Sequence, residues 1–147
     1  MQQEEFGIQN IYVKDISFEA PNSPEIFMED WKPKMEYEIS NDIKQLEEKV
    51  FDIVLNITVT VKSEEKTAFL VEVHQAGIFV VSGFAEDQLK HMLNTYCPTI
   101  LYPYAREMIS SIVTKGGFQP LLLAPINFEA LYAEQQQKQS DQPTTLH

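Results

Sequence analysis

Two pairs of residues carry the most specific chemistry in this sequence, and both suit the docking of a protein partner. Leu70 and Glu72 lie two residues apart in an alternating segment, so they share one face if that segment is a strand. Asp15 and Glu19 lie four residues apart in another such segment, roughly 13 Å along a strand. An exposed leucine beside a carboxylate is a candidate contact for a partner. The residues alone also allow an ordinary solvated sheet face with one scattered apolar side chain.

No arrangement typical of catalysis or metal binding occurs in the sequence. It contains no G-x-S-x-G, no Walker loop, no G-x-G-x-x-G and no H-E-x-x-H. The three histidines, His74, His91 and His147, have no metal-ligand spacing, and Cys97 has no partner cysteine. We expect His74 to be exposed on a strand and Cys97 to be a small buried residue. The sequence therefore predicts no enzyme activity, no metal and no cofactor.

Composition favours one globular domain in a reducing compartment. The chain has 147 residues, of which 44% are hydrophobic, and a single cysteine excludes an internal disulfide. A formal net charge of −11 repels nucleic acid and anionic lipid and would attract a basic protein. No apolar run reaches membrane-helix length, and the start of the sequence lacks the pattern of a signal peptide. We therefore expect a cytoplasmic protein that neither inserts in membranes nor binds nucleic acid.

Four segments that alternate between apolar and polar residues must position the candidate docking residues. They cover about 8–20, 35–46, 51–62 and 67–79, and each is typical of a strand with one buried face. Strict alternation in the first puts Ile8, Tyr12, Ile16 and Phe18 on one face, and Ile11 and Val13 on the other with Asp15, Ser17 and Glu19. The clearest row, in the third, is Phe51, Ile53, Leu55, Ile57, Val59 and Val61. A tight S-E-E-K turn at 63–66 favours antiparallel pairing with the fourth.

The connection between the first two strands is long and rich in large apolar side chains. Prolines at 21, 24 and 33 exclude a regular element across most of it, yet it contains Ile26, Phe27, Met28 and Trp31. Such a loop must pack onto the core or wait for a partner, and the residues leave both possibilities open.

Helical periodicity begins after Gly83. A first helix is predicted from about Glu86 to near Pro98, and a second has Ile100, Tyr104, Met108 and Ile112 on one stripe and ends at Lys115 and Gly116. Asn127 is expected to cap a last helix. Strands followed by helices predict an α+β fold, in which helices pack on one face of a four-stranded antiparallel sheet. A single domain would span 1–147, with residues 1–7 and about 134–147 flexible, and the surplus apolar surface suggests an oligomer.

Six blocks of the sequence resemble the SecB family of bacterial protein-export chaperones, in order and at close to the family spacing, over about residues 8–132. The first strand carries Gln9, Ile11, Tyr12 and Lys14-Asp15-Ile16-Ser17-Phe18-Glu19-Ala20-Pro21-Asn22, and the loop carries Asp30-Trp31 and Pro33. The fourth strand carries Thr67-Ala68-Phe69-Leu70, Glu72, Val73, Gln75 and Gly77-Ile78-Phe79. The rest are Tyr96-Cys97-Pro98, then Leu101 with Pro103-Tyr104-Ala105-Arg106-Glu107, then Leu123-Ala124-Pro125 with Asn127, Phe128, Ala130 and Leu131.

The resemblance implies a Greek-key-like sheet and a homotetramer, a dimer of dimers. It also implies an ATP-independent chaperone that binds unfolded preproteins and delivers them to the motor ATPase SecA. The positions by which the family docks SecA correspond to Asp15, Glu19, Leu70 and Glu72, and all four residue types are retained.

For the other two surfaces, the resemblance points to client binding by Phe27, Trp31 and Phe79, and to an oligomer interface at Val71, Val73 and Gln75. Val71 stands where the family often has a cysteine, and the tail is rich in glutamine where many relatives end acidic. The alternative function is a general holdase, or a chaperone associated with a toxin–antitoxin system, that has the same fold and another delivery partner.

Overall fold

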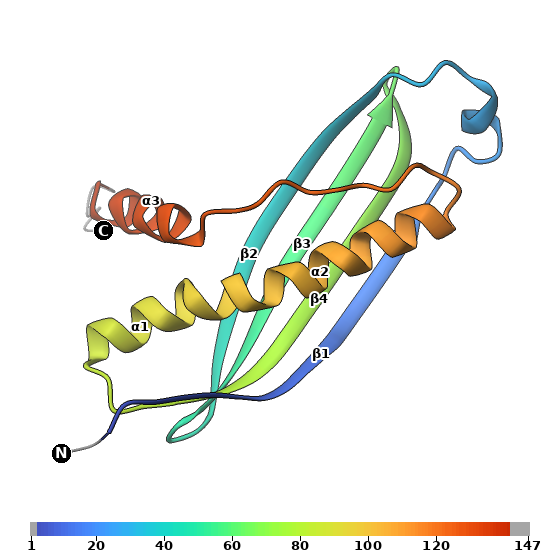
Figure 1. Cartoon of the computed structure of the whole chain (residues 1–147). Helices are drawn as coiled ribbons and strands as arrows, with labels where there is room; N and C mark the ends of the chain where they lie inside the picture. The colour runs from blue at the N-terminus through green and yellow to red at the C-terminus, as the bar shows by residue number, and fades with distance from the viewer. Residues whose placement is uncertain (1–2, 142–147) are drawn as a thin grey trace, which may run out of the picture.

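The four alternating segments form the strands of one antiparallel sheet: β1 (Glu5–Glu19), β2 (Pro33–Glu47), β3 (Val50–Ser63) and β4 (Lys66–Ser82). The structure is a computed structural model and describes residues 3–141. The strand order is β1-β4-β3-β2 (Figure 1). β2, β3 and β4 follow one another through two hairpins, while β1 lies beside β4, so the predicted Greek-key-like sheet is confirmed.

A two-residue turn joins β3 to β4, as the sequence predicts. Glu64 and Glu65 both have positive φ, at 49° and 70°. Two successive residues with positive φ form the turn type whose twist matches that of a hairpin. Glycine usually occupies these positions because a Cβ atom makes this conformation costly, and asparagine is tolerated because its short polar side chain can hydrogen-bond locally.

Two bulges in β1 change which side chains face the helices. The register shifts between Ile8 and Asn10 and again between Val13 and Asp15. Tyr12 lies opposite Ala76 of β4, whereas Val13 lies opposite Gln75. Directly paired residues share a face, so Ile11 and Val13 face the helices and Tyr12 faces away with Asp15. The strict alternation predicted for this strand is therefore wrong in its middle third.

Two consecutive helices, α1 (Glu86–Asn94) and α2 (Tyr96–Lys115), follow the sheet. The first helix ends at Asn94 rather than near Pro98, because the backbone of Thr95 leaves the helical region. Pro98 lies in the first turn of α2, where its missing N–H costs nothing. α2 crosses one face of the sheet diagonally (Figure 1) and packs mainly on β4.

The core lies between α2 and the odd-numbered residues of β3 and β4. The predicted row of β3 is confirmed, since all six of its side chains are buried. On α2, however, the buried stripe is Leu101, Ala105, Ile109 and Val113, one residue later than predicted. The predicted stripe lies along the side of the helix, where Tyr104 is exposed and Ile100 and Met108 are half-buried. Both sides of α2 are apolar, so periodicity alone did not separate them.

The last helix, α3 (Phe128–Asp141), lies beside β2 after an irregular segment at 117–127 (Figure 1). The predicted cap is confirmed, because the Asn127 side-chain oxygen accepts a hydrogen bond from the Ala130 amide at 3.0 Å. β1 begins at Glu5 and α3 continues through Asp141, so regular structure extends further than the flexible ends that the sequence predicts. Glutamine, glutamate and alanine favour helix, which accounts for the extension of α3. Residues 1–2 and 142–147 lie outside the described part of the chain.

Candidate functional site

The four candidate docking residues lie together on the sheet face turned away from α2, which we call the outer face. β1 and β4 are neighbours, and Glu19 pairs directly with Leu70. Ser17 pairs with Glu72, and Asp15 pairs with His74 on the same face. Side chains paired in this way lie about 5 Å apart. The sequence places these residues in two separate strands, and the register joins them into one acidic patch around a half-buried leucine.

The acidic patch continues across the sheet onto β2, which the sequence analysis did not include. Leu70 pairs with Thr60, which pairs with Glu36, and Glu72 pairs with Thr58, which pairs with Glu38. Both glutamates belong to the polar residues that alternate with apolar ones along β2. Only the strand order, with β3 between β2 and β4, places them in the same rows as the docking residues.

The bulge after Val13 is what places Asp15 and Tyr12 on the outer face together. The Tyr12 hydroxyl donates to the Asp52 carboxylate at 2.6 Å, joining β1 to β3 across β4. This hydrogen bond, with burial and the negative charge of Asp52, raises the pKa of Tyr12 to about 12. The bond ties the edge strand that holds Asp15 and Glu19 to the central strands.

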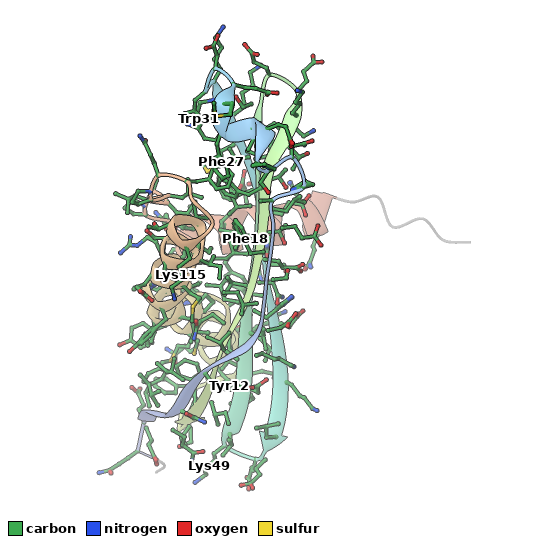
Figure 2. All side chains as sticks on the ribbon, turned by 90° about the vertical axis from the view of Figure 1, so that its right-hand side faces the viewer. Tyr12, Phe18, Phe27, Trp31, Lys49 and Lys115 are labelled. Atoms are coloured by element: carbon green, nitrogen blue, oxygen red, sulfur yellow. The ribbon has the colours of Figure 1, made fainter. Side chains whose placement is uncertain are left out.

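A second surface is built from aromatic side chains of the β1–β2 connection. Phe27 and Trp31 remain 47% and 41% exposed, and both rings pack at a tilt against Phe118, with centroids 5.0 and 5.8 Å away. Phe118 in turn packs on the buried Phe69 of β4, at 4.9 Å. Figure 2 shows Phe27 and Trp31 at one end of the molecule, beyond the end of α2 at Lys115. The loop therefore both packs onto the core and exposes apolar surface: Ile26 is buried, while Phe27 and Trp31 remain partly exposed.

Phe79, the third residue expected at a client surface, is not available to a client. Its side chain is 0% exposed and lies on the helix-covered face of β4, where its ring packs against Phe6 at 5.8 Å. Odd-numbered residues of β4 face α2, so Phe79 belongs to the core. Other exposed apolar side chains include Met28, Met35, Tyr37 and Leu122. Met35 and Tyr37 lie on the helix side of β2, a strand that α2 does not cover.

The expected interface residues are also buried within the single chain. Val71, Val73 and Gln75 lie on the helix face of β4 and are at most 2% exposed, and Gln75 donates to the carbonyl oxygen of Tyr12 at 3.1 Å. They cannot contact a second subunit directly in this arrangement. They instead support α2, whose other side presents Tyr96 and Tyr104 to solvent.

Among residues 3–141, no group of three or more histidine, cysteine or acidic side chains is placed to hold a metal ion. Cys97 is buried, as predicted, and burial raises the pKa of its thiol to about 12. No helix in the same part of the chain is long and apolar enough to cross a bilayer. Among the described residues, the acidic outer face and the exposed aromatic surface each have a clear physical use.

Known proteins resemble this chain over nearly its whole length. The family model described as preprotein translocase subunit SecB matches residues 1–139. The protein-export protein SecB of Methylococcus capsulatus is 55% identical over 145 residues, covering 97% of this chain and 94% of that protein. The SecB of Nitrosococcus oceani is 57% identical over 139 residues, covering 93% of this chain and 85% of that protein.

A solved structure agrees with the fold. A SecB-like chaperone of Mycobacterium tuberculosis, solved in complex with a peptide of the HigA1 antitoxin, superposes with a TM-score of 0.65 at 17% identity. The match covers 82% of this chain and 90% of that chain, and at this identity it shows the fold alone. Because the family model spans nearly the whole sequence and the curated relatives share more than half of their aligned residues with it, this chain belongs to the SecB family of protein-export chaperones.

Proposed function

We propose that this protein is an ATP-independent, cytoplasmic chaperone that holds unfolded preproteins and delivers them to the motor ATPase SecA. The observation that carries the proposal is the single outer-face patch formed by Asp15, Glu19, Leu70 and Glu72. These four residues come from two strands, and each matches the residue type expected for SecA docking.

The outer face suits a basic partner for a physical reason. The patch carries three carboxylates, and Glu36 and Glu38 extend it, while Leu70 offers one apolar contact at its centre. Charge complementarity of this kind raises the association rate and favours basic partners over acidic ones. Exposed charges are screened within about 8–10 Å at physiological salt, so docking should weaken as salt rises.

The client surface is proposed at Phe27 and Trp31, extended by Met35 and Tyr37 on the helix side of the sheet. Large apolar side chains that stay exposed can bind many unfolded chains without recognising a specific sequence. This surface and the docking patch use different faces of the sheet. A bound client therefore leaves the outer face free for the motor, which a delivery chaperone requires.

The proposed assembly is a homotetramer, a dimer of dimers, held in part by the exposed side of α2. Tyr96, Ile100, Tyr104 and Met108 recur every fourth residue, so they form one apolar stripe on that side. In this arrangement Val71, Val73 and Gln75 support assembly from beneath by fixing the position of α2.

Calorimetry with SecA tests the docking proposal. The double variant Asp15→Lys, Glu72→Lys reverses two charges of the patch, and we expect SecA affinity to fall at least about tenfold, or about 1.4 kcal/mol. Glu86→Lys, at the start of α1, makes a charge reversal away from the outer face and should leave SecA affinity unchanged. Both variants should still delay refolding of a slow-folding preprotein. Unchanged SecA affinity in the double variant would contradict this docking site and point to a holdase with another partner.

A further inference from the structure

One candidate docking residue, Glu72, already has a polar partner within the chain. The imidazole of His74 lies on the same strand face, with its Nε2 atom 3.0 Å from Glu72 Oε1. Its Nδ1 atom contacts the side-chain oxygen of Asn56 on the neighbouring strand β3. His74 therefore has a hydrogen-bond partner at each ring nitrogen, and both partners are oxygen atoms.

The orientation of the Asn56 amide is set by its other neighbours. Its Nδ2 atom donates to the Asp42 carboxylate at 2.8 Å and to the Ser40 hydroxyl at 3.2 Å. A carboxylate accepts hydrogen bonds and cannot donate them, so the amide nitrogen must face Asp42. The amide oxygen consequently faces His74, where it too can only accept.

Two acceptors at one imidazole require a proton on each ring nitrogen. A neutral histidine has one N–H and one lone pair, so it could satisfy Glu72 or Asn56 but not both. We propose that His74 is the protonated resident counter-ion of Glu72, and that a cation of the docking partner displaces it with release of a proton. The inference rests on the proposed docking function and adds a residue that sets its pH dependence.

The charged groups around His74 come from all four strands. Glu72 is on the same strand, Asp15 pairs with His74 from β1, and Glu38 lines the hollow on one side. A second hollow of about 450 Å³, which His74 also lines, contains Asp42 and Asp52 with two cations, Lys14 and Lys44. Carboxylates thus outnumber the lysines, and Glu72 is the one at hydrogen-bonding distance from the ring.

The direction of the effect follows from competition for one carboxylate. At low pH the imidazolium occupies Glu72, so a cation of the partner must displace it and docking is weaker. Histidine side chains ordinarily lose their charge between about pH 5 and 8, and once the ring is neutral Glu72 is free for the partner. Docking should therefore strengthen as pH rises, by at most about tenfold per pH unit for one released proton.

Calorimetric titration with SecA at constant ionic strength, between pH 6 and pH 8, tests the proposal. We expect wild-type affinity to rise severalfold over this range, and His74→Gln to bind more tightly than wild type at pH 6 and to lose most of the rise. Measurement in two buffers of different ionisation enthalpy should give a net proton release at pH 6.5 that His74→Gln reduces. His91→Gln is the matched control, because His91 pairs with Glu129 between α1 and α3, and it should keep the wild-type profile.

The free protein gives an independent measurement. Long-range proton–nitrogen spectra of the ring at pH 6 should show both His74 nitrogens protonated in wild type. A single protonated nitrogen, or a His74→Gln profile that parallels wild type, would overturn the inference. If wild-type protein fails to bind SecA at every pH, the docking function itself is wrong, and the spectra still decide the state of His74.

Discussion

Whether an aromatic side chain serves the client or the core depends on the face from which it projects. Phe79 and Trp31 are both large aromatics that the family resemblance assigns to client binding, yet Phe79 lies under α2, whereas Trp31 packs against Phe118 and stays 41% exposed. Their substitutions should therefore produce different phenotypes.

We expect Phe79→Ala to lower the free energy of unfolding by about 3–5 kcal/mol, because it leaves a cavity in the core. Trp31→Ala should change stability by much less and should weaken binding of an unfolded client about tenfold, since an exposed aromatic anchor is lost. Denaturant unfolding and fluorescence binding with a labelled client measure the two effects. A stable Phe79→Ala protein with a specific loss of client binding would contradict this assignment.

Cys97 provides a test of burial at a single atom. The thiolate is the reactive form of cysteine, and burial raises the pKa of this thiol to about 12, against about 8.5 for a free cysteine. At pH 8 the native thiol should therefore react with a disulfide reagent at least about a hundredfold more slowly than in the urea-unfolded chain. A native rate close to the unfolded rate would show that the N-terminal turn of α2 opens readily.

At the scale of single elements, the sequence predicted the strands well and the faces of α2 and β1 less well. Apolar and polar residues alternate over 51–62 except at Val54, and the odd-numbered row is buried in the structure. In β1, a bulge inserts one residue after Val13 without any glycine or proline to mark it, so the change of face was not predictable from residue types. In α2, apolar residues lie on two sides, and only the tertiary arrangement decides that Leu101 faces the sheet and Tyr104 does not.

The candidate site was predictable within single strands but not between them. The spacing of Leu70 and Glu72 showed that they share a face, whereas their contact with β1 needed the pairing of Glu19 with Leu70. Glu36 joins the patch through the register of three strands, β2, β3 and β4, and His74 meets Asn56 through the register of two, β3 and β4. A single sequence does not contain this register.

A substitution in the β3–β4 turn should increase the stability of the protein. Glu65 has φ of 70°, a conformation that costs a residue with a Cβ atom roughly 1 kcal/mol or more, and that glycine adopts freely. We expect Glu65→Gly to raise the midpoint of thermal unfolding. Thr67→Gly, two residues later inside β4, should lower it, because glycine in a strand loses more conformational freedom on folding. A lower midpoint for Glu65→Gly would show that the glutamate makes a compensating contact.

At the scale of the whole molecule, the proposed tetramer must overcome the repulsion among subunits that each carry a formal charge of −11. Such repulsion is long-ranged but screened by salt, whereas burial of apolar surface contributes about 25 cal/mol per Å² at any ionic strength. The subunit contacts should therefore centre on the apolar side of α2, which has few charges, and leave the acidic outer face toward solvent. The same arrangement keeps the docking patch of every subunit accessible to a basic partner.

Tyr104→Glu tests this placement of the interface. Tyr104 is 51% exposed in the single chain, so a charge there should not unfold the subunit, but it should cost several kcal/mol if the ring is buried between subunits. We expect light scattering to show loss of the tetramer while circular dichroism keeps the wild-type secondary structure. Tyr37→Glu is the matched control, because Tyr37 is 53% exposed but lies on β2, and it should retain the tetramer and weaken client binding instead. Loss of the tetramer in Tyr37→Glu with a wild-type mass for Tyr104→Glu would move the interface from α2 to the β2 edge.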